Sequence, residues 1–357
     1  DLLKIISDKA SFGLSDYRWY SKDSIYRFDI SRIDYDNQTL LVKGILIRPT
    51  FGLYGQSHKN KFQSDVIQGK VESIRVDGLA PLSFLENRNL QLKSLTLDGV
   101  NLDIFRDKRI PFDTLVLRYM VQDLMKNAYL NADIGSIHVK NSGITYFEFA
   151  KEGNLPGRIA FEDLQVDMAP FYLRKKDTPY PIDRLRAGIR TSIMGNSDIQ
   201  LAALMSFDEK SSMDVAIEIG ELDLVSINDF LEKTLFVKIQ DGKVNYGNWE
   251  FTLDDDYAVG EMRLAYSDLK LQFVDSLTYD QGKGKLKLLG FLVNTFAKND
   301  NPRGGSSRIV RSEIFQQRDK SKFIFNAWWK ATLSGLRGTF GLGKAKIPKE
   351  IRKEEDD

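Results

Sequence analysis

Few residues in this chain have side chains that could serve as metal ligands, nucleophiles or general bases. The 357 residues include no cysteine and two histidines, His58 and His138. The absence of cysteine excludes disulfide frameworks, thiolate metal sites and cysteine nucleophiles. His138 lies on the strand face opposite Ile137 and Val139, and His58 lies in a polar loop, so we interpret both as solvated residues. These counts argue against enzyme classes that depend on His or Cys.

Two further segments have the composition of a binding site but not its spacing. Asp254, Asp255 and Asp256 could offer oxygen ligands to a metal, yet adjacent residues at a strand end point in opposite directions, which favours an acidic turn. The segment 282–285 (GKGK) resembles a phosphate loop only in composition and reads better as a hairpin turn. The zinc-protease, nucleophile-elbow, Walker and EF-hand motifs are absent. We therefore expect no enzyme activity, no metal and no cofactor.

Charge and hydropathy narrow the class of protein further. The 51 basic and 50 acidic residues give a net charge of +1, which argues against a dedicated nucleic-acid binder. Hydrophobic residues make up 42% of the chain, enough for a sizeable buried surface. Apolar runs such as 288–293 are far shorter than the ~20 residues that span a bilayer. The chain opens at Asp1 without methionine, so we expect a mature or trimmed piece.

The dominant pattern is period-two alternation of apolar residues. It is clearest at Leu40–Ile47, Ile74–Leu79 and Leu95–Ile104, each with a glycine where the phase slips by one, and looser at Ile137–Tyr146 and Val237–Tyr246. Alternation places apolar side chains on one face of a sheet. A glycine at the phase slip indicates a bulge or tight bend that keeps the apolar side chains on the same face.

The spacing of these segments suggests a repeated unit. Ser73, Ser94 and Ser136 each open a copy, at separations of 21 and 42 residues. Helical crossovers are missing over most of the chain, so a repeated strand pair in one long sheet fits better than a two-layer α/β fold. We predict a mostly-β chain: a long, curled antiparallel sheet that forms an open groove, with a few short helices. A sealed sandwich core is the alternative interpretation of the same alternation.

Three helices are predicted, over residues 111–128, 226–231 and 319–340. Pro111 suits a first helical turn, and Ser226 suits an N-cap. At 100° per residue the third is amphipathic. Its apolar side bears Phe325, Trp328, Trp329, Thr332, Leu333, Leu336 and Phe340; Asn326, Lys330, Ser334 and Arg337 lie outside it.

The terminal helix has two interpretations, which the residues leave open. Its aromatic side could plug the end of the sheet, or it could contact a membrane interface. Residues 298–349 contain 12 Lys or Arg and 3 Asp or Glu, a local balance of +9, which suits anionic headgroups. For that contact we single out Phe325, Trp328, Trp329, Lys330, Leu336 and Arg337.

These patterns divide the chain into four parts. We expect a β-groove domain of repeated strand units over residues 1–297 and a linker over 298–318. An amphipathic helix is expected over 319–343 and a charged, disordered tail over 344–357.

Several stretches, taken in order, resemble the AsmA-like family of Gram-negative envelope proteins. They are residues 95–109 (LTLDGVNLDIFRDKR), 137–148 (IHVKNSGITYFE), and 237–246 with 260–270. The fourth is a C-terminal signature from Val293 through the Asn-Pro pair at 301–302 to the Trp-Trp pair at 328–329 and Leu336. The resemblance touches most of the chain from about residue 90 to 340.

The resemblance implies a periplasmic repeating β-groove, anchored to the inner membrane by an N-terminal helix absent from this chain, with a role in lipid movement or outer-membrane homeostasis. It brings no catalytic residues. The expected partners are a phospholipid or other lipid, a membrane surface and an envelope protein. The alternative is a non-enzymatic β-rich scaffold for an envelope assembly. The residues expected to line the groove are Val42, Ile45, Ile74, Val76, Leu95, Leu97, Leu102, Ile104, Ile137, Val139, Ile144, Tyr146, Val237, Ile239, Val244 and Tyr246.

Overall fold

One large open sheet contains every named strand of the protein. The computed structural model describes residues 11–81, 84, 88–280, 298–304 and 306–354. Strands make up 53% of it and helices 14%, which confirms the expectation of a mostly-β chain with one long sheet and few helices. The strands are β1 (Phe12–Tyr20), β2 (Tyr26–Asp36), β3 (Thr39–Pro49), β4 (Val66–Asp77), β5 (Asn89–Asp107), β6 (Asn131–Phe149), β7 (Gly157–Met168), β8 (Phe171–Leu173), β9 (Arg184–Ile193), β10 (Ser197–Ser206), β11 (Met213–Ile219), β12 (Leu222–Asp223), β13 (Val237–Leu253), β14 (Tyr257–Phe273) and β15 (Arg311–Gln317).

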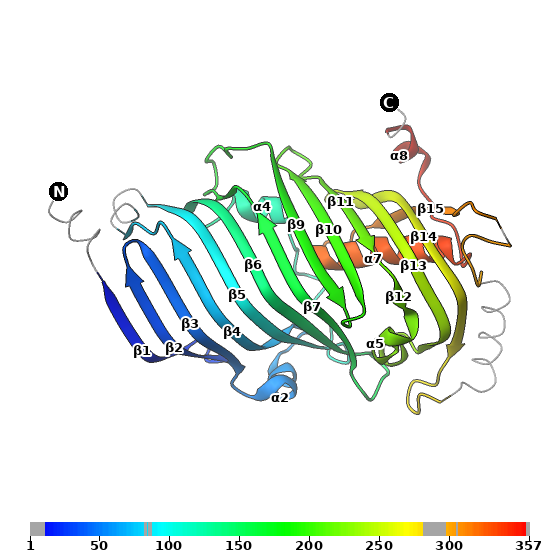
Figure 1. The fold of residues 1–357 in the computed structure, drawn as a ribbon, viewed down its shortest axis with the longest axis horizontal. Helices are drawn as coiled ribbons and strands as arrows, with labels where there is room; N and C mark the ends of the chain where they lie inside the picture. The colour runs from blue at the N-terminus through cyan, green and yellow to red at the C-terminus, as the bar shows by residue number, and fades with distance from the viewer. Residues whose placement is uncertain (1–10, 82–83, 85–87, 281–297, 305, 355–357) are drawn as a thin grey trace.

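The strands follow chain order across the sheet, from β1 at one edge to β15 at the other (Figure 1). Short β8 and β12 lie off this path, paired with β6 and β13. The expectation of a purely antiparallel sheet was wrong at one place, because β5 and β6 run parallel. A parallel pair requires a crossover connection. Residues 108–130, which we call the crossover, provide it.

A line of irregular residues crosses β1 to β7 near the middle of the strands. The ladders from β1 to β5 each lack one residue pair there, the β5–β6 ladder lacks two, and the ladders on both sides of β7 shift register. Positive φ angles occur on this line at Asp16, Gly44, Gly99, Asn141 and Asp163. Apolar alternation changes phase by one residue at this line. The bends predicted at the glycines of β3 and β5 are therefore present, and they are shared by neighbouring strands.

The helices are shorter than the sequence indicated. The helix expected over 111–128 is helical only in α4 (Val121–Lys126). The helix expected over 226–231 is a 3-10 turn, η1 (Leu224–Ile227), followed by α5 (Asn228–Thr234). It is capped by the carboxylate of Asp223, which accepts from the Val225 N–H, rather than by Ser226. The terminal helix is α7 (Ile324–Thr339), within the range 319–343.

Three further elements lie where none was expected. Helix α2 (Gly52–Lys59) includes His58, which we had placed in a loop. Strand β15 lies inside residues 298–318, where a linker was expected, and the short helix α8 (Lys349–Glu354) lies in the tail expected to be disordered. The GKGK segment at 282–285 and the apolar run at 288–293 lie outside the described residues.

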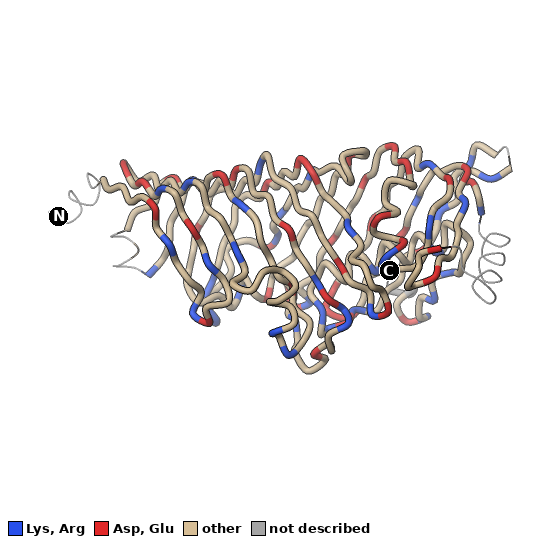
Figure 2. The backbone as a smooth tube through the Cα atoms, turned by 90° about the horizontal axis from the view of Figure 1, so that it is seen from below, with Lys and Arg blue, Asp and Glu red and all other residues tan. Residues whose placement is uncertain are grey.

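Helices α7 and α4 lie against the same face of the sheet (Figure 1). The main hydrophobic core is there, between α7, the crossover and strands β9 to β15. Acidic and basic residues are scattered along the whole length of the sheet (Figure 2).

Candidate functional site

A single row of apolar side chains runs across twelve neighbouring strands. Residues directly opposite each other in a ladder share a face of the sheet, and the register connects Leu14 on β1 to Met262 on β14 without a polar residue. The members of this Leu14 row are Leu14, Ile33, Val42, Ile74, Leu97, Val139, Val166, Ile189, Leu201, Ile217, Trp249 and Met262. At ~4.8 Å per strand the row is roughly 50 Å long.

The next row of side chains belongs to the opposite face and has a different composition. Its members are Gly13, Asp34, Leu41, Arg75, Thr96, His138, Asp167, Gly188, Ala202, Ala216, Glu250, Glu261 and Glu313. The sheet therefore has an apolar face, defined by the Leu14 row, and a largely polar face. His138 lies on the polar face, as predicted, with Nδ1 2.7 Å from the Asp167 carboxylate.

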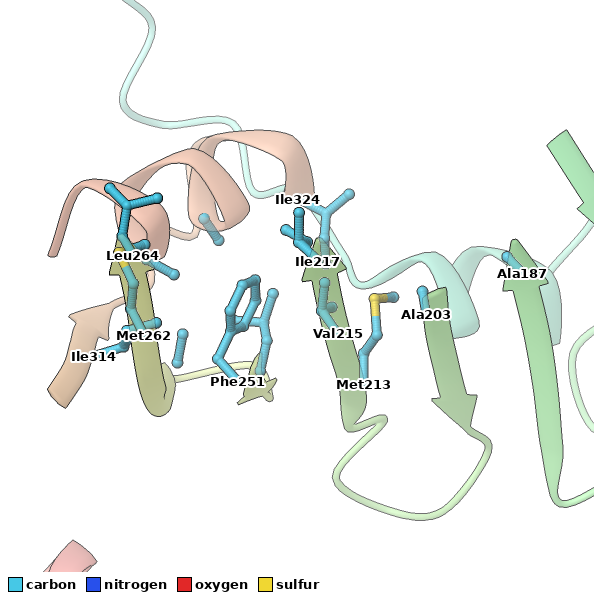
Figure 3. Close-up of a cluster of buried hydrophobic side chains, with 14 of the residues drawn as sticks. Ala187, Ala203, Met213, Val215, Ile217, Phe251, Met262, Leu264, Ile314 and Ile324 are labelled. Carbon is cyan, nitrogen blue, oxygen red and sulfur yellow. The ribbon is translucent and has the colours of Figure 1, made fainter. Parts of the chain in front are cut away.

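Exposure changes along the Leu14 row. Leu14 is 44% exposed, the members from Ile33 to Leu201 are partly buried, and Ile217 and Met262 are buried. Exposure decreases along the row because α7 and the crossover lie over the end of the apolar face that is nearest to β15 (Figure 3).

Helix α7 approaches the sheet closely through small side chains. Its buried residues are Ile324, Ala327, Ala331, Gly335 and Thr339. A Cβ atom at position 335 would lie 2.9 Å from Cε of Met262, so the helix packs directly on the Leu14 row. The Trp249 indole donates to Thr332 Oγ1 at 3.0 Å, and the Ser312 hydroxyl donates to the Gly335 carbonyl at 2.8 Å.

The crossover seals the next part of the face. Met120 and Met125 are buried in the same core as α7. The Gln122 amide donates to the carbonyls of Ser211 and Ser212 at 2.9 Å each, which ties α4 to the β10–β11 hairpin.

A buried arginine joins the crossover to the start of α7. The Arg318 side chain is 1% exposed, and its guanidinium donates to the Asp255 carboxylate at 2.6 Å and to the Arg118 carbonyl. The Arg118 N–H in turn donates to the Lys320 carbonyl at 2.7 Å. Asp254 accepts from the N–H groups of Asp256 and Tyr257, as in the predicted acidic turn.

Most residues expected to line a groove lie on the apolar face, by alternation and register. Ile45, Ile137, Ile239 and Val244 are buried, while most of the others are partly exposed. Ile239 and Val244 belong to the sealed core rather than to an accessible surface. Tyr246 was assigned to the wrong face. The ladder shifts register between Val244 and Tyr246, so this tyrosine pairs with Ala265 on the polar face and is 50% exposed.

The residues chosen for membrane contact are divided between two environments. Trp328 and Leu336 are partly buried against the core, whereas Phe325 and Trp329 are 62% and 41% exposed. Lys330 and Arg337 are exposed too. Part of the basic charge of residues 298–349 is paired within the chain. Lys320 binds Asp255 and Asp256 at 2.8 Å each, and Lys322 lies 3.5 Å from Asp319.

A polar cluster interrupts the apolar face at the end of β5 and β6. Arg106 makes two short bonds to the Asp65 carboxylate, and the Tyr146 hydroxyl donates to Glu148 at 2.9 Å. Lys108 lies 2.6 Å from Glu148. Burial, with the Glu148 charge, raises the pKa of Tyr146 above its usual range, so this hydroxyl acts as a neutral donor. The cluster is charge-balanced.

Sequence reasoning missed two groups of exposed apolar residues. Phe12, Leu14, Tyr17 and Trp19 on β1 continue the apolar face, and their alternation, broken at Asp16, could have revealed them. Leu115, Leu117 and Tyr119 in the crossover are 89%, 62% and 61% exposed. The helix expected over 111–128 concealed them, because a helix would have turned some of them inward.

The described residues contain no cluster of three or more His, Asp or Glu side chains placed to hold a metal. No helix in the described parts of the chain has both the length and the apolar composition that crossing a bilayer requires. No family model matches this chain, and no curated protein matches it.

Proposed function

We propose that the protein binds lipid acyl chains along the part of the apolar face between β1 and β7, which would act as an open groove. The observation that carries this proposal is the Leu14 row, which is apolar at every strand yet only partly buried over that region. A monomeric soluble protein seldom leaves so continuous an apolar strip accessible unless it contacts a ligand or partner.

The dimensions suit a long hydrocarbon chain. Seven strands at ~4.8 Å cover roughly 30 Å, and an extended acyl chain of membrane lipid is on the order of 20 Å long. Burial of its methylene groups against Val42, Ile74, Leu97 and Val139 would contribute about 0.8 kcal/mol per group. The headgroup would stay in water at the strand ends.

The groove in this proposal is shorter than the whole sheet. Side chains of α7 and the crossover already occupy the apolar face from about β9 to β15. Ile239 and Val244 therefore stabilise a closed end and do not contact lipid. A closed end limits how far an acyl chain slides along the row.

The exposed side of α7 is proposed to contact a membrane surface. Phe325 and Trp329 suit the interfacial region, and Lys330 and Arg337 suit anionic headgroups. Because Lys320 and Lys322 are paired within the chain, the charge available for lipid is smaller than the local balance of +9. We expect anionic vesicles to bind more tightly than neutral ones, with a moderate dependence on salt. The proposed periplasmic location and inner-membrane anchor have the family resemblance as their only support.

A scaffold role in an envelope assembly is the second candidate. The observation that favours it is the exposed crossover segment with Leu115, Leu117 and Tyr119, which presents an irregular apolar surface of the kind that a protein partner would bury. A scaffold would need these residues and would not need the Leu14 row.

Binding of a phospholipid with a fluorescent acyl chain distinguishes the two roles. For lipid binding, Leu97→Asp abolishes the fluorescence change, while Leu117→Ser leaves it intact. Binding unaffected by Leu97→Asp, in a variant that keeps its fold, would contradict the proposal. Vesicle binding that is unchanged by Trp329→Ala would contradict the role given to α7.

A further inference from the structure

The two edge strands of the sheet, β1 and β15, differ in how their outer sides are covered. On β15 the outer backbone groups of Phe315 are satisfied by α7: its N–H donates to Ser334 Oγ at 3.2 Å, and the Ser334 hydroxyl donates back to its carbonyl at 2.9 Å. Arg311 and Glu313 add exposed charges to this edge. Charges and a covering helix are the usual means by which proteins block the addition of another strand.

The β1 edge has no covering helix among the described residues, and its charged residues are Asp16 and Arg18. Its nine residues are all exposed, and its only strand partner in the described chain is β2. Phe12, Leu14, Tyr17 and Trp19 on the apolar face are 57%, 44%, 43% and 50% exposed. An edge strand with this many exposed aromatic residues is a template for pairing.

The irregular line across the sheet sets the pattern that a new neighbour of β1 must have. In β1, β3 and β5 the apolar residues lie two positions before and one after the residue with positive φ. In β2 and β4 the residue on the irregular line lies opposite one with positive φ, and its nearest apolar neighbours lie one position before it and two positions after it. Around Ser31 of β2 this gives the spacing Phe28-x-Ile30-x-x-Ile33-x-Tyr35. The two kinds of strand alternate. An antiparallel strand beside β1 must therefore be of the second kind.

We propose that the β1 edge is a docking site for an extended segment of another polypeptide, paired antiparallel, with four apolar residues in the spacing of β2. The opposite face adds a charge preference. Arg18 is half exposed and its guanidinium lies 2.7 Å from the Asp29 carboxylate of β2, so an acidic residue at the matching position of the docked strand is favoured. A docked strand adds one more member to the Leu14 row. The inference does not depend on lipid binding.

A peptide with the sequence of residues 26–36 (YRFDISRIDYD) is the probe, and the same peptide without its central serine is the matched control. The deletion turns the apolar spacing of the peptide into strict alternation, which no longer matches the phase change that β1 makes at Asp16. We expect the complete peptide to bind the full chain at least tenfold more tightly than the control. Equal binding of the two peptides, or no binding of either, would overturn the proposal. Self-association of the chain without peptide binding would instead indicate a second copy as the occupant.

A disulfide locates the bound peptide, because the chain has no cysteine of its own. With Leu14→Cys in the protein and Ile33→Cys in the peptide, the two thiols lie directly opposite each other, within reach of a disulfide. Gln317→Cys, on the capped β15 edge, is the control. We expect cross-linking at position 14 and none at 317. The reverse result, or equal cross-linking at both, would place the peptide elsewhere. Peptide binding to the unmodified chain decides the question if a cysteine variant fails to fold.

Discussion

A Cβ atom at position 99 would lie 2.4 Å from Cγ of Glu72, the residue beside it on β4, and Gly99 has a φ of +65°. The same relationship holds between position 44 and Ser31, where the distance to Oγ is also 2.4 Å. Both glycines lie on the irregular line that crosses β1 to β7. This line keeps the apolar side chains of long strands on one face while the alternation changes phase.

Replacing Gly99 with alanine should therefore destabilise the protein. The positive φ and the contact with Glu72 together cost about 1–3 kcal/mol. Gly188→Ala is the matched control on β9, because a Cβ atom there meets nothing within 4 Å. Chemical denaturation measures both. Equal denaturation midpoints for Gly99→Ala and Gly188→Ala would show that a side chain at position 99 causes no strain at the irregular line.

Arg318→Met tests the connection between the crossover and α7. The substitution keeps much of the side-chain volume but removes the bonds to Asp255 and to the Arg118 carbonyl, and we expect a loss of about 1–3 kcal/mol in the free energy of unfolding. Lys320→Met is the control, since its exposed pairs with Asp255 and Asp256 are worth less than about 1 kcal/mol. If both variants unfold alike, the buried guanidinium does not hold the two segments together.

Stability should fall in acid and not in mild base. Hydrogen bonds from Arg75 hold the pKa of Asp77 below its usual value of 3.8, and a hydrogen bond from Ser321 does the same for the pKa of Asp319. A carboxylate with a lowered folded-state pKa adds stability above its unfolded pKa and loses it as the pH falls through the lower value. The melting temperature should be nearly constant from about pH 8 to 5 and decrease below about pH 4. Asp319→Asn should reduce the decrease.

Charge on the apolar face should be tolerated between β1 and β7 and not under α7. Leu97→Asp places a carboxylate on a partly exposed position, where water still reaches it, so the variant should fold. Val215→Asp places one in the sealed core, at a side chain only 1% exposed, and should prevent folding. Circular dichroism and thermal melts distinguish the two. Failure of Leu97→Asp to fold would favour the sandwich-core interpretation for the whole sheet.

The sequence predicted the parts of the fold that depend on local patterns. Alternation located the apolar side chains of β3, β4, β5 and β6, and the glycine phase slips located bends at Gly44 and Gly99. The parallel pairing of β5 and β6 was not predictable, because it depends on a crossover whose residues have helical spacing but form one short helix. Met120 and Met125 are held there by contacts with strands far away in the sequence.

The prediction of the candidate site succeeded and failed for the same reasons as the prediction of the fold. Fifteen of the sixteen residues expected to line a groove share the apolar face, and Tyr246 does not, because a register shift in β13 carries no signal in the sequence. Exposure was not predictable from alternation. Ile239 and Leu97 have the same pattern around them, yet only Ile239 is covered by other elements. The apolar side of α7 was predicted from its aromatic residues. In the structure, the helix packs closely on the sheet through the stripe that contains Ala331 and Gly335.

The most direct test of lipid binding is site-specific photo-crosslinking along the Leu14 row. A photoreactive amino acid is introduced singly at Val42, Ile74 or Leu97, and at Glu250 on the polar face as a control, and lipid adducts are identified by mass spectrometry in the purified chain. The account predicts phospholipid adducts at the three row positions and none at Glu250. No adducts at the row positions, or equal adducts at Glu250, in correctly folded variants would contradict it.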